Sequence, residues 1–194
     1  MTKNIIKHKY SKKHHTFDLL NVSYQNNSNA SKIGKKHGYR MDYNLSNDDQ
    51  KVFYKPQKSP IIVYPGTYRK KDINTDLKLA IGKGKNTHRF QNALKNANAI
   101  ENKYGKNAKV MGHSLGGSIA EYVGSQNSNR KVITYNKGIG INQIGKKINP
   151  NQTDIRHKKD LISLLNLTQH GGKKVEINNN QNLISAHKLK SLIN

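Results

Sequence analysis

The residues from Val110 to Gly117 read VMGHSLGG and place one serine, Ser114, inside a G-x-S-x-G pattern. This pattern is typical of a nucleophile elbow, a sharp strand-to-helix turn that holds the serine hydroxyl exposed above a sheet. Glycines flank the serine because side chains there would collide with the neighbouring strand or helix. The pattern also occurs in ordinary strand-to-helix turns, so its meaning depends on partners elsewhere in the chain. Ser114 is the candidate nucleophile.

A serine hydroxyl is a poor nucleophile near neutral pH and needs a histidine as its base. A carboxylate orients that histidine, and in the elbow architecture the acid precedes the histidine, both following the serine. The acids that follow Ser114 are Glu121, Asp154, Asp160 and Glu176, and the histidines are His157, His170 and His187.

Asp160 is the favoured acid because it comes just after a predicted strand, residues 154–157. Reactive groups in open α/β sheets gather at the carboxyl ends of the strands. Asp154 begins the same strand and would lie at the opposite end, while Glu121 falls within a helix and Glu176 within a strand. The other interpretation of Asp160 is a solvent-facing aspartate among basic neighbours.

His187 is the favoured base because it enters the predicted C-terminal helix, residues 183–194, from where it can reach the edge of the sheet. His157 would lie on a strand, and His170 precedes a Gly-Gly turn that is typical of a surface. His113 adjoins the serine, but neighbouring side chains on a sharp elbow diverge, so we interpret it as a packing residue. The predicted catalytic set is Ser114, Asp160 and His187.

An acyl-transfer reaction also needs donors that stabilise the oxyanion of the tetrahedral intermediate. The backbone N–H of Leu115, at the start of the helix after the elbow, is one predicted donor. Thr67 follows a predicted strand, residues 61–64, and offers both its N–H and its hydroxyl. Leu115 and Thr67 are therefore the predicted oxyanion hole.

The elements around these residues alternate between strands and helices. A helical stripe of apolar residues predicts a helix over residues 88–104, which Gly105 closes, and a second helix follows Ser114. Residues 25–50 are polar and predict a loop with one helical turn. The strands are predicted at residues 52–54, 61–64, 109–111, 132–135, 154–157 and 173–177. This alternation predicts an α/β fold with a mostly parallel central sheet and helices on both faces.

Composition limits the possible partners. The net charge of +24 favours phosphate-rich partners such as an anionic membrane surface or nucleic acid. The absence of cysteine excludes disulfides and thiolate zinc sites, and we expect no metal or cofactor. We predict one domain over residues 17–194 after a basic, mobile arm, residues 1–16. Without a recognisable signal peptide or an apolar span, an intracellular or virion-associated location is favoured.

Taken in order, these motifs resemble the class 3, fungal-type lipases of the α/β-hydrolase fold. The elbow from Gly112 to Gly117 matches that family residue for residue, and residues 61–67 resemble its strand that ends in an oxyanion glycine and a hydroxyl residue. Asp160 and His187 stand where the family has its acid and its late histidine. The chain departs from the family at Pro65, where an arginine is usual, and in having no tryptophan.

The resemblance implies a serine ester hydrolase of lipase or phospholipase type that acts on lipid acyl esters through a Ser-Asp-His triad. It also implies a lid over residues 68–87, whose lysines and arginine would favour an anionic membrane surface. The alternative function is a weak or inactive hydrolase fold that binds nucleic acid or another anionic surface through its charge.

Overall fold

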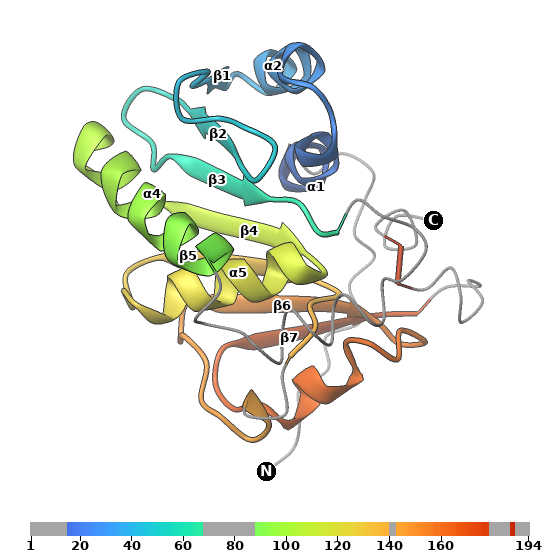
Figure 1. Ribbon diagram of the computed structural model, residues 1–194. Helices are drawn as coiled ribbons and strands as arrows, with labels where there is room; N and C mark the ends of the chain where they lie inside the picture. Colours follow the sequence, from blue (N-terminus) through green and yellow to red (C-terminus); the bar gives the residue numbers. More distant parts are fainter. Residues whose placement is uncertain (1–14, 68–87, 140–142, 179–186, 189–194) are drawn as a thin grey trace.

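The computed structural model describes residues 15–67, 88–139, 143–178 and 187–188. In this part of the chain a single twisted sheet has the strand order β1 to β7, the same order as in the sequence (Figure 1). The strands are β1 (Arg40–Met41), β2 (Lys51–Tyr54), β3 (Ile61–Tyr64), β4 (Lys109–His113), β5 (Lys131–Tyr135), β6 (Gln152–His157) and β7 (Lys173–Ile177). β1, β2 and β3 pair antiparallel, and every pair from β3 to β7 is parallel. The predicted mostly parallel sheet is confirmed.

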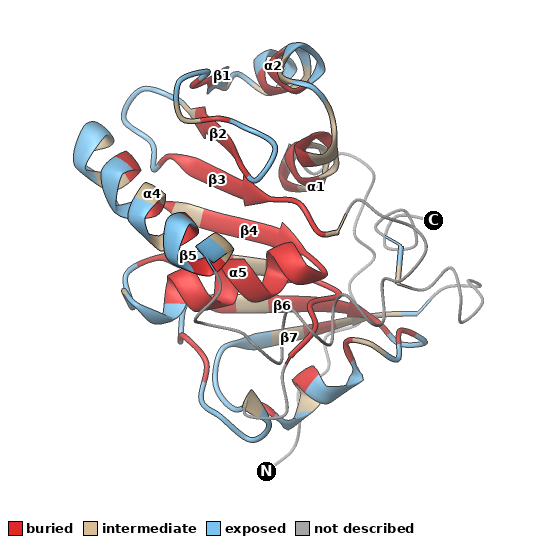
Figure 2. Ribbon diagram, in the orientation of Figure 1, coloured by how far each residue is buried: buried red, intermediate tan, exposed pale blue. Residues whose placement is uncertain are grey.

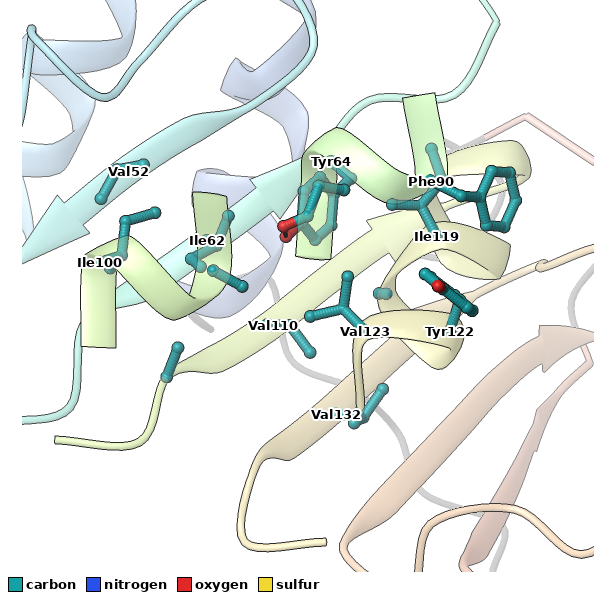
Figure 3. Packing of buried hydrophobic residues seen from close by; sticks show 14 of the residues in the cluster. Val52, Ile62, Tyr64, Phe90, Ile100, Val110, Ile119, Tyr122, Val123 and Val132 are labelled. Carbon is teal, nitrogen blue, oxygen red and sulfur yellow. Dashed lines mark hydrogen bonds between the residues drawn. The ribbon is translucent and has the colours of Figure 1, made fainter. Parts of the chain in front are cut away.

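Helices cover both faces of this sheet, as predicted. The helical segments are α1 (His15–Asn21), η1 (Val22–Tyr24), α2 (Asn27–Lys36), α4 (His88–Tyr104), α5 (Leu115–Ser125) and η4 (Leu164–Thr168). α4 and α5 pack on one face, against a cluster that includes Ile62, Val110 and Val132 (Figure 3). α1 packs on the other face, where Leu19 and Leu20 join a second cluster. Because alternate strand residues point to opposite faces, the buried strands supply both clusters (Figure 2).

α4 has the bounds that its apolar stripe predicts. Phe90, Ala93, Ala97 and Ile100 recur at helical spacing and are the buried residues of the helix. Gly105 ends it with a φ of 64° and donates its N–H to the Glu101 carbonyl at 2.8 Å. A glycine adopts this left-handed conformation without strain, and the predicted end of the helix is therefore confirmed.

The prediction for residues 25–50 was wrong, because this stretch forms α2 and β1 as well as loops. Asn26 caps α2 by accepting a hydrogen bond from the N–H of Asn29 at 2.9 Å. The packing face of α2 is made of small residues, and a side-chain carbon added at Gly34 would lie 2.9 Å from Phe53. These buried residues follow helical spacing but carry little apolar surface, so the polar composition of the stretch hid the helix.

Several predicted segments lie outside the described residues. They are the lid, residues 68–87, nearly all of the C-terminal helix, and residues 1–14 of the N-terminal arm. His15 and Thr16, the last two residues of that predicted arm, already belong to α1, and Thr16 is buried. None of the described helices is long and apolar enough to cross a membrane.

Two glycine-to-alanine substitutions distinguish a glycine that is needed for close packing from one that is needed for a positive φ. A side-chain carbon at Gly116 would lie 2.1 Å from the Tyr64 carbonyl oxygen, so Gly116→Ala should lower the free energy of unfolding by about 3 kcal/mol or more. Gly105→Ala meets nothing within 4 Å and only strains the positive φ, so it should cost about 1 kcal/mol. Urea unfolding of both variants tests this ranking, and equal losses would contradict it.

Candidate active site

Ser114 occupies the tight turn between β4 and α5, with φ 55° and ψ −123°. A non-glycine residue at positive φ is strained, and such strain persists only where the surroundings hold it. Here the strand and helix approach too closely for side chains, since a carbon at Gly112 would lie 2.0 Å from the Gly116 carbonyl oxygen. The predicted elbow geometry is therefore present, and Ser114 stands at its tip, above the carboxyl end of β4.

The structure brings Ser114, His187 and Asp160 together, although they come from distant parts of the chain. The Ser114 Oγ lies 2.9 Å from His187 Nε2. His187 Nδ1 lies 3.1 Å from each carboxylate oxygen of Asp160. Because an ionised carboxylate can only accept, His187 Nδ1–H donates to Asp160 and its Nε2 is left to accept from the serine hydroxyl. This tautomer is the one that a general base requires.

Asp160 is held in the ionised form in a buried position. Burial by itself would raise the pKa of its carboxyl, but hydrogen bonds from His187, Ser163 and Ile162 and the charge of His187 lower the pKa overall. The N–H of Ile162 donates to Asp160 Oδ1 at 3.1 Å, and Arg156 donates to the Asp160 carbonyl at 3.0 Å. A buried anion with fixed donors is suited to orienting an imidazole.

The other acids considered from the sequence have other partners. Glu121 and Asp154 both form ion pairs with the fully buried Lys137. Burial would lower the pKa of Lys137, but the charges of Asp154 and Glu121 outweigh it and raise that pKa. Glu176 pairs with Arg156. Of the four candidate acids, Asp160 is the one that contacts His187, the histidine beside Ser114, in the part of the chain that the structure describes.

The predicted oxyanion donors are Leu115, which directly follows Ser114, and Thr67, which follows a glycine close to Ser114. A carbon added at Gly66 would be 3.1 Å from Ser114 Cβ, so the segment from Pro65 to Thr67 passes directly next to the serine. Leu115 begins α5, where the first N–H groups of a helix have no intrahelical partner. The Thr67 hydroxyl is buried and has no hydrogen-bond partner among the described residues. An unpaired buried hydroxyl is costly unless a ligand satisfies it, which fits a donor kept for an oxyanion.

Sequence reasoning missed a hydrogen-bonded chain that runs behind the triad. The N–H of Gly66 donates to Tyr24 Oη at 2.7 Å, and that hydroxyl lies 2.8 Å from His113 Nδ1. His113 Nε2 lies 2.8 Å from the backbone carbonyl of His187, which also accepts from Asn136 at 3.3 Å. His113 is thus more than the packing residue predicted. No local signal reveals the pair, because Tyr24 is 89 residues from His113.

The donor and acceptor of each hydrogen bond between Gly66 and the His187 carbonyl follow from these two end groups. The His187 carbonyl can only accept, so His113 Nε2 carries the hydrogen and its Nδ1 accepts from the Tyr24 hydroxyl. Tyr24 then accepts from Gly66, which leaves one consistent arrangement. These hydrogen bonds connect Gly66 to the backbone carbonyl of His187, so we expect Tyr24 and His113 to position the two sides of the candidate site.

Tyr24→Phe should leave the fold intact and lower kcat for ester hydrolysis by about 10- to 100-fold with little change in KM, because it removes the hydroxyl that bonds to Gly66 and His113. Steady-state kinetics with a soluble ester measure this. The matched control is Tyr43→Phe, at a position that is 55% exposed and remote from the triad. Equal kinetics for the two variants would show that the chain does not position the site.

His113 also predicts a pH dependence of stability. Burial, and secondly the charge of His187, lower the pKa of His113 to about 3. A histidine in an unfolded chain has a pKa of about 6.5. Between about pH 3 and pH 6.5, His113 is therefore protonated in the unfolded state and neutral in the folded state. The free energy of unfolding should therefore fall as the pH drops from about 6.5, by an amount on the order of a few kcal/mol. His113→Phe should flatten this slope in urea unfolding at several pH values, and an unchanged slope would contradict the assignment.

No group of three metal-ligating side chains occurs among the residues that the structure describes. A hollow of about 680 Å³ lies at the amino ends of β3, β4 and β5, and Ile61, Lys109 and Lys131 line it. Ser114 follows the carboxyl end of β4, so this hollow lies at the opposite end of the sheet and is not the substrate site.

A mostly parallel sheet between two helical layers, with a serine at a strained elbow facing a histidine and a buried aspartate, is the arrangement of the α/β-hydrolase class. The comparison with family models is more specific. Residues 25–164 match a phospholipase-like family, described as the Tle-like phospholipase domain. The match covers more than half of the chain, which therefore belongs to this family.

The match includes Thr67, Ser114, Leu115 and Asp160 and ends before His187. It supports lipid esters as the substrate class and gives no specific support to the class 3 lipases or to the nucleic-acid alternative. A search of curated proteins finds no significant match.

Proposed function

We propose that this protein is a serine-dependent phospholipase that hydrolyses carboxylic esters of phospholipids through Ser114, His187 and Asp160. The observation that carries the proposal is the continuous contact from Ser114 Oγ through His187 to Asp160, at 2.9 and 3.1 Å. Membership of the phospholipase-like family supports the substrate class. The resemblance to class 3 lipases is retained as the expected arrangement of the catalytic groups.

In the first half-reaction, Ser114 Oγ attacks the acyl carbonyl carbon while His187 Nε2 takes the hydroxyl proton. The carbonyl oxygen becomes negatively charged, and the N–H groups of Leu115 and Thr67 and the Thr67 hydroxyl stabilise it by donating hydrogen bonds to it. His187, now protonated and stabilised by Asp160, gives its proton to the leaving alcohol oxygen as the ester bond breaks. The products are an acyl-enzyme and a lysophospholipid.

In the second half-reaction, water takes the place of the leaving alcohol. His187 removes one proton from the water, whose oxygen attacks the acyl carbon, and then returns that proton to Ser114 Oγ. The fatty acid is released and the enzyme returns to its starting state. Pro65 has no N–H, but the donors proposed here belong to other residues, so its place in the oxyanion segment is compatible with the reaction.

A fluorophosphonate probe tests the proposal directly, because it labels only an activated serine. We expect one label, on the peptide that contains Ser114, together with fatty acid release from phosphatidylglycerol vesicles. The probe should not label protein that was unfolded in urea. Absence of labelling in folded protein, or labelling at another serine, would refute the assignment.

A further inference from the structure

The segment of residues 160–169 buries polar side chains and exposes apolar ones, the reverse of the usual arrangement. Its buried residues are polar and recur every third position, namely Asp160, Ser163, Asn166 and Gln169. Three residues per turn is the repeat of the 3-10 helix that η4 forms. This spacing puts the four polar side chains on the inner face of the segment, where an ordinary surface helix would have apolar residues.

Each inner side chain is held by specific hydrogen bonds. Asn166 donates to the Lys137 carbonyl at 2.7 Å, and Gln169 donates to Glu121 at 3.1 Å while accepting from Lys137 at 2.9 Å. The Ser163 hydroxyl accepts from Arg156 at 3.3 Å. The orientation of the segment is therefore fixed by buried polar contacts, and it does not result from loose packing.

The outer face consequently carries leucines. Leu161, Leu164 and Leu165 are 66%, 45% and 41% exposed. Ile144, 42% exposed, lies in the adjoining loop, where the N–H of Gly145 donates to Thr168 Oγ1 at 3.3 Å. These are four of the five large exposed hydrophobic residues found among the described residues. A grouped apolar surface of this kind marks a binding site more often than a chance exposure does.

Exposed lysines adjoin these apolar residues in the sequence. Lys158 and Lys159 immediately precede the segment, Lys146 and Lys147 follow Ile144, and all four are exposed. The acids of residues 143–178 offer no competing surface charge, because Asp154 and Asp160 are buried and Glu176 is paired with Arg156. The surface is thus apolar with a basic margin, which complements an anionic lipid bilayer.

We propose that the leucine face, defined as Ile144, Leu161, Leu164 and Leu165, docks this protein on an anionic phospholipid bilayer. The leucines enter the interface between headgroups and acyl chains, and the lysines around them contact lipid phosphates. The inference rests on the proposed function, because lipid is the substrate. Leu161 directly follows Asp160, so docking through this face brings the triad to the membrane surface. In Figure 1 the segment is orange and lies beside β7, and in Figure 2 its outer positions are pale blue.

A tryptophan reporter tests docking without catalysis, because the chain has no tryptophan of its own. In a Ser114→Ala background, which leaves the lipid intact, Leu165→Trp should show a blue shift of its emission and quenching by brominated lipid on addition of phosphatidylglycerol vesicles. Tyr43→Trp is the matched control, since Tyr43 is also exposed, at 55% against 41% for Leu165, but follows β1 at the other edge of the sheet. It should show neither change. The same response at both positions, or none at Leu165, overturns the proposal.

Partition into phosphatidylglycerol vesicles gives a second measurement. Leu164→Ser with Leu165→Ser should weaken partition about tenfold or more, since each buried leucine carries several methylene equivalents. Lys158→Gln with Lys159→Gln should weaken it by about tenfold, and this part should vanish in high salt. The control, Lys35→Gln with Lys36→Gln on α2, removes the same charge at the opposite edge of the sheet and should have a much smaller effect.

Hydrolysis of a water-soluble ester separates this inference from the proposed function. The leucine variants should hydrolyse p-nitrophenyl butyrate at the rate of the unchanged protein while losing activity on vesicles. If vesicle partition is unaffected and sedimentation instead shows that the variants dissociate a dimer, the leucine face is a self-association surface and the membrane proposal is wrong. If the tryptophan inserts but Ser114 takes up no fluorophosphonate, docking stands and the proposed catalysis fails.

Discussion

Replacing Ser114 with alanine is expected to lower kcat for ester hydrolysis on the order of 10⁶-fold. The Ser114 oxygen is the atom that attacks the acyl carbon, and it lies 2.9 Å from the base that activates it. Alanine removes this oxygen and with it only the hydrogen bond to His187, so the free energy of unfolding should change little. Release of p-nitrophenol and of fatty acid, measured on the same preparations, tests the expectation.

The matched control for Ser114→Ala is Ser125→Ala. Ser125 ends the same helix, α5, and its hydroxyl makes only local contacts, donating to the Tyr122 carbonyl at 2.7 Å and accepting from Gln126 Nε2 at 3.0 Å. This variant should keep full activity. If Ser114→Ala retained more than a trace of activity while remaining folded, another nucleophile would have to be sought.

Asp160→Asn is expected to lower kcat about 10⁴-fold. An asparagine amide can donate to His187 Nδ1, which would place the ring hydrogen on Nε2, facing Ser114 Oγ. The imidazole is then unable to accept the serine proton, even though the distances around it are preserved. KM should change much less than kcat, and fluorophosphonate labelling of Ser114 should slow in parallel.

Asp48→Asn is the control for this charge change, because Asp48 is exposed on the loop before β2. It removes one negative charge from a chain of net charge +24 without touching the triad. Comparable kinetic losses in both variants would mean that overall charge, and not the Asp160–His187 contact, controls activity. Full activity of Asp160→Asn would exclude Asp160 as the orienting acid.

Local patterns in the sequence were enough to predict the sheet and the elbow. The strands β2 to β7 and helix α4 have strong periodicity and clear breakers, so their types and approximate bounds follow from short windows. The elbow follows from glycines that permit a close approach of β4 and α5. The acid was predicted by elimination, because Asp160 alone among four carboxylates follows the carboxyl end of a strand.

Other features depend on contacts between residues far apart in the sequence, and short stretches of sequence did not reveal them. The buried residues of α2 are small, and Gly34 among them lies against Phe53 of β2, so its packing depends on a side chain from another element. The roles of Tyr24 and His113 depend on a hydrogen bond between residues 89 positions apart. The leucine face is likewise invisible in composition, since a run of leucines after Asp160 reads as core until its polar neighbours are seen to be buried.

By itself, then, the sequence determined that a serine would stand at the end of a strand, with an aspartate and a histidine following it in an order that suits hydrolysis. Only the tertiary structure decided that these groups meet, which side chains bind the His187 carbonyl, and which side of the segment after Asp160 faces outward. The physical reason is the range of the forces involved. Hydrophobic periodicity and glycine conformation act within a few residues, whereas directional hydrogen bonds between distant segments form only once the sheet has placed them.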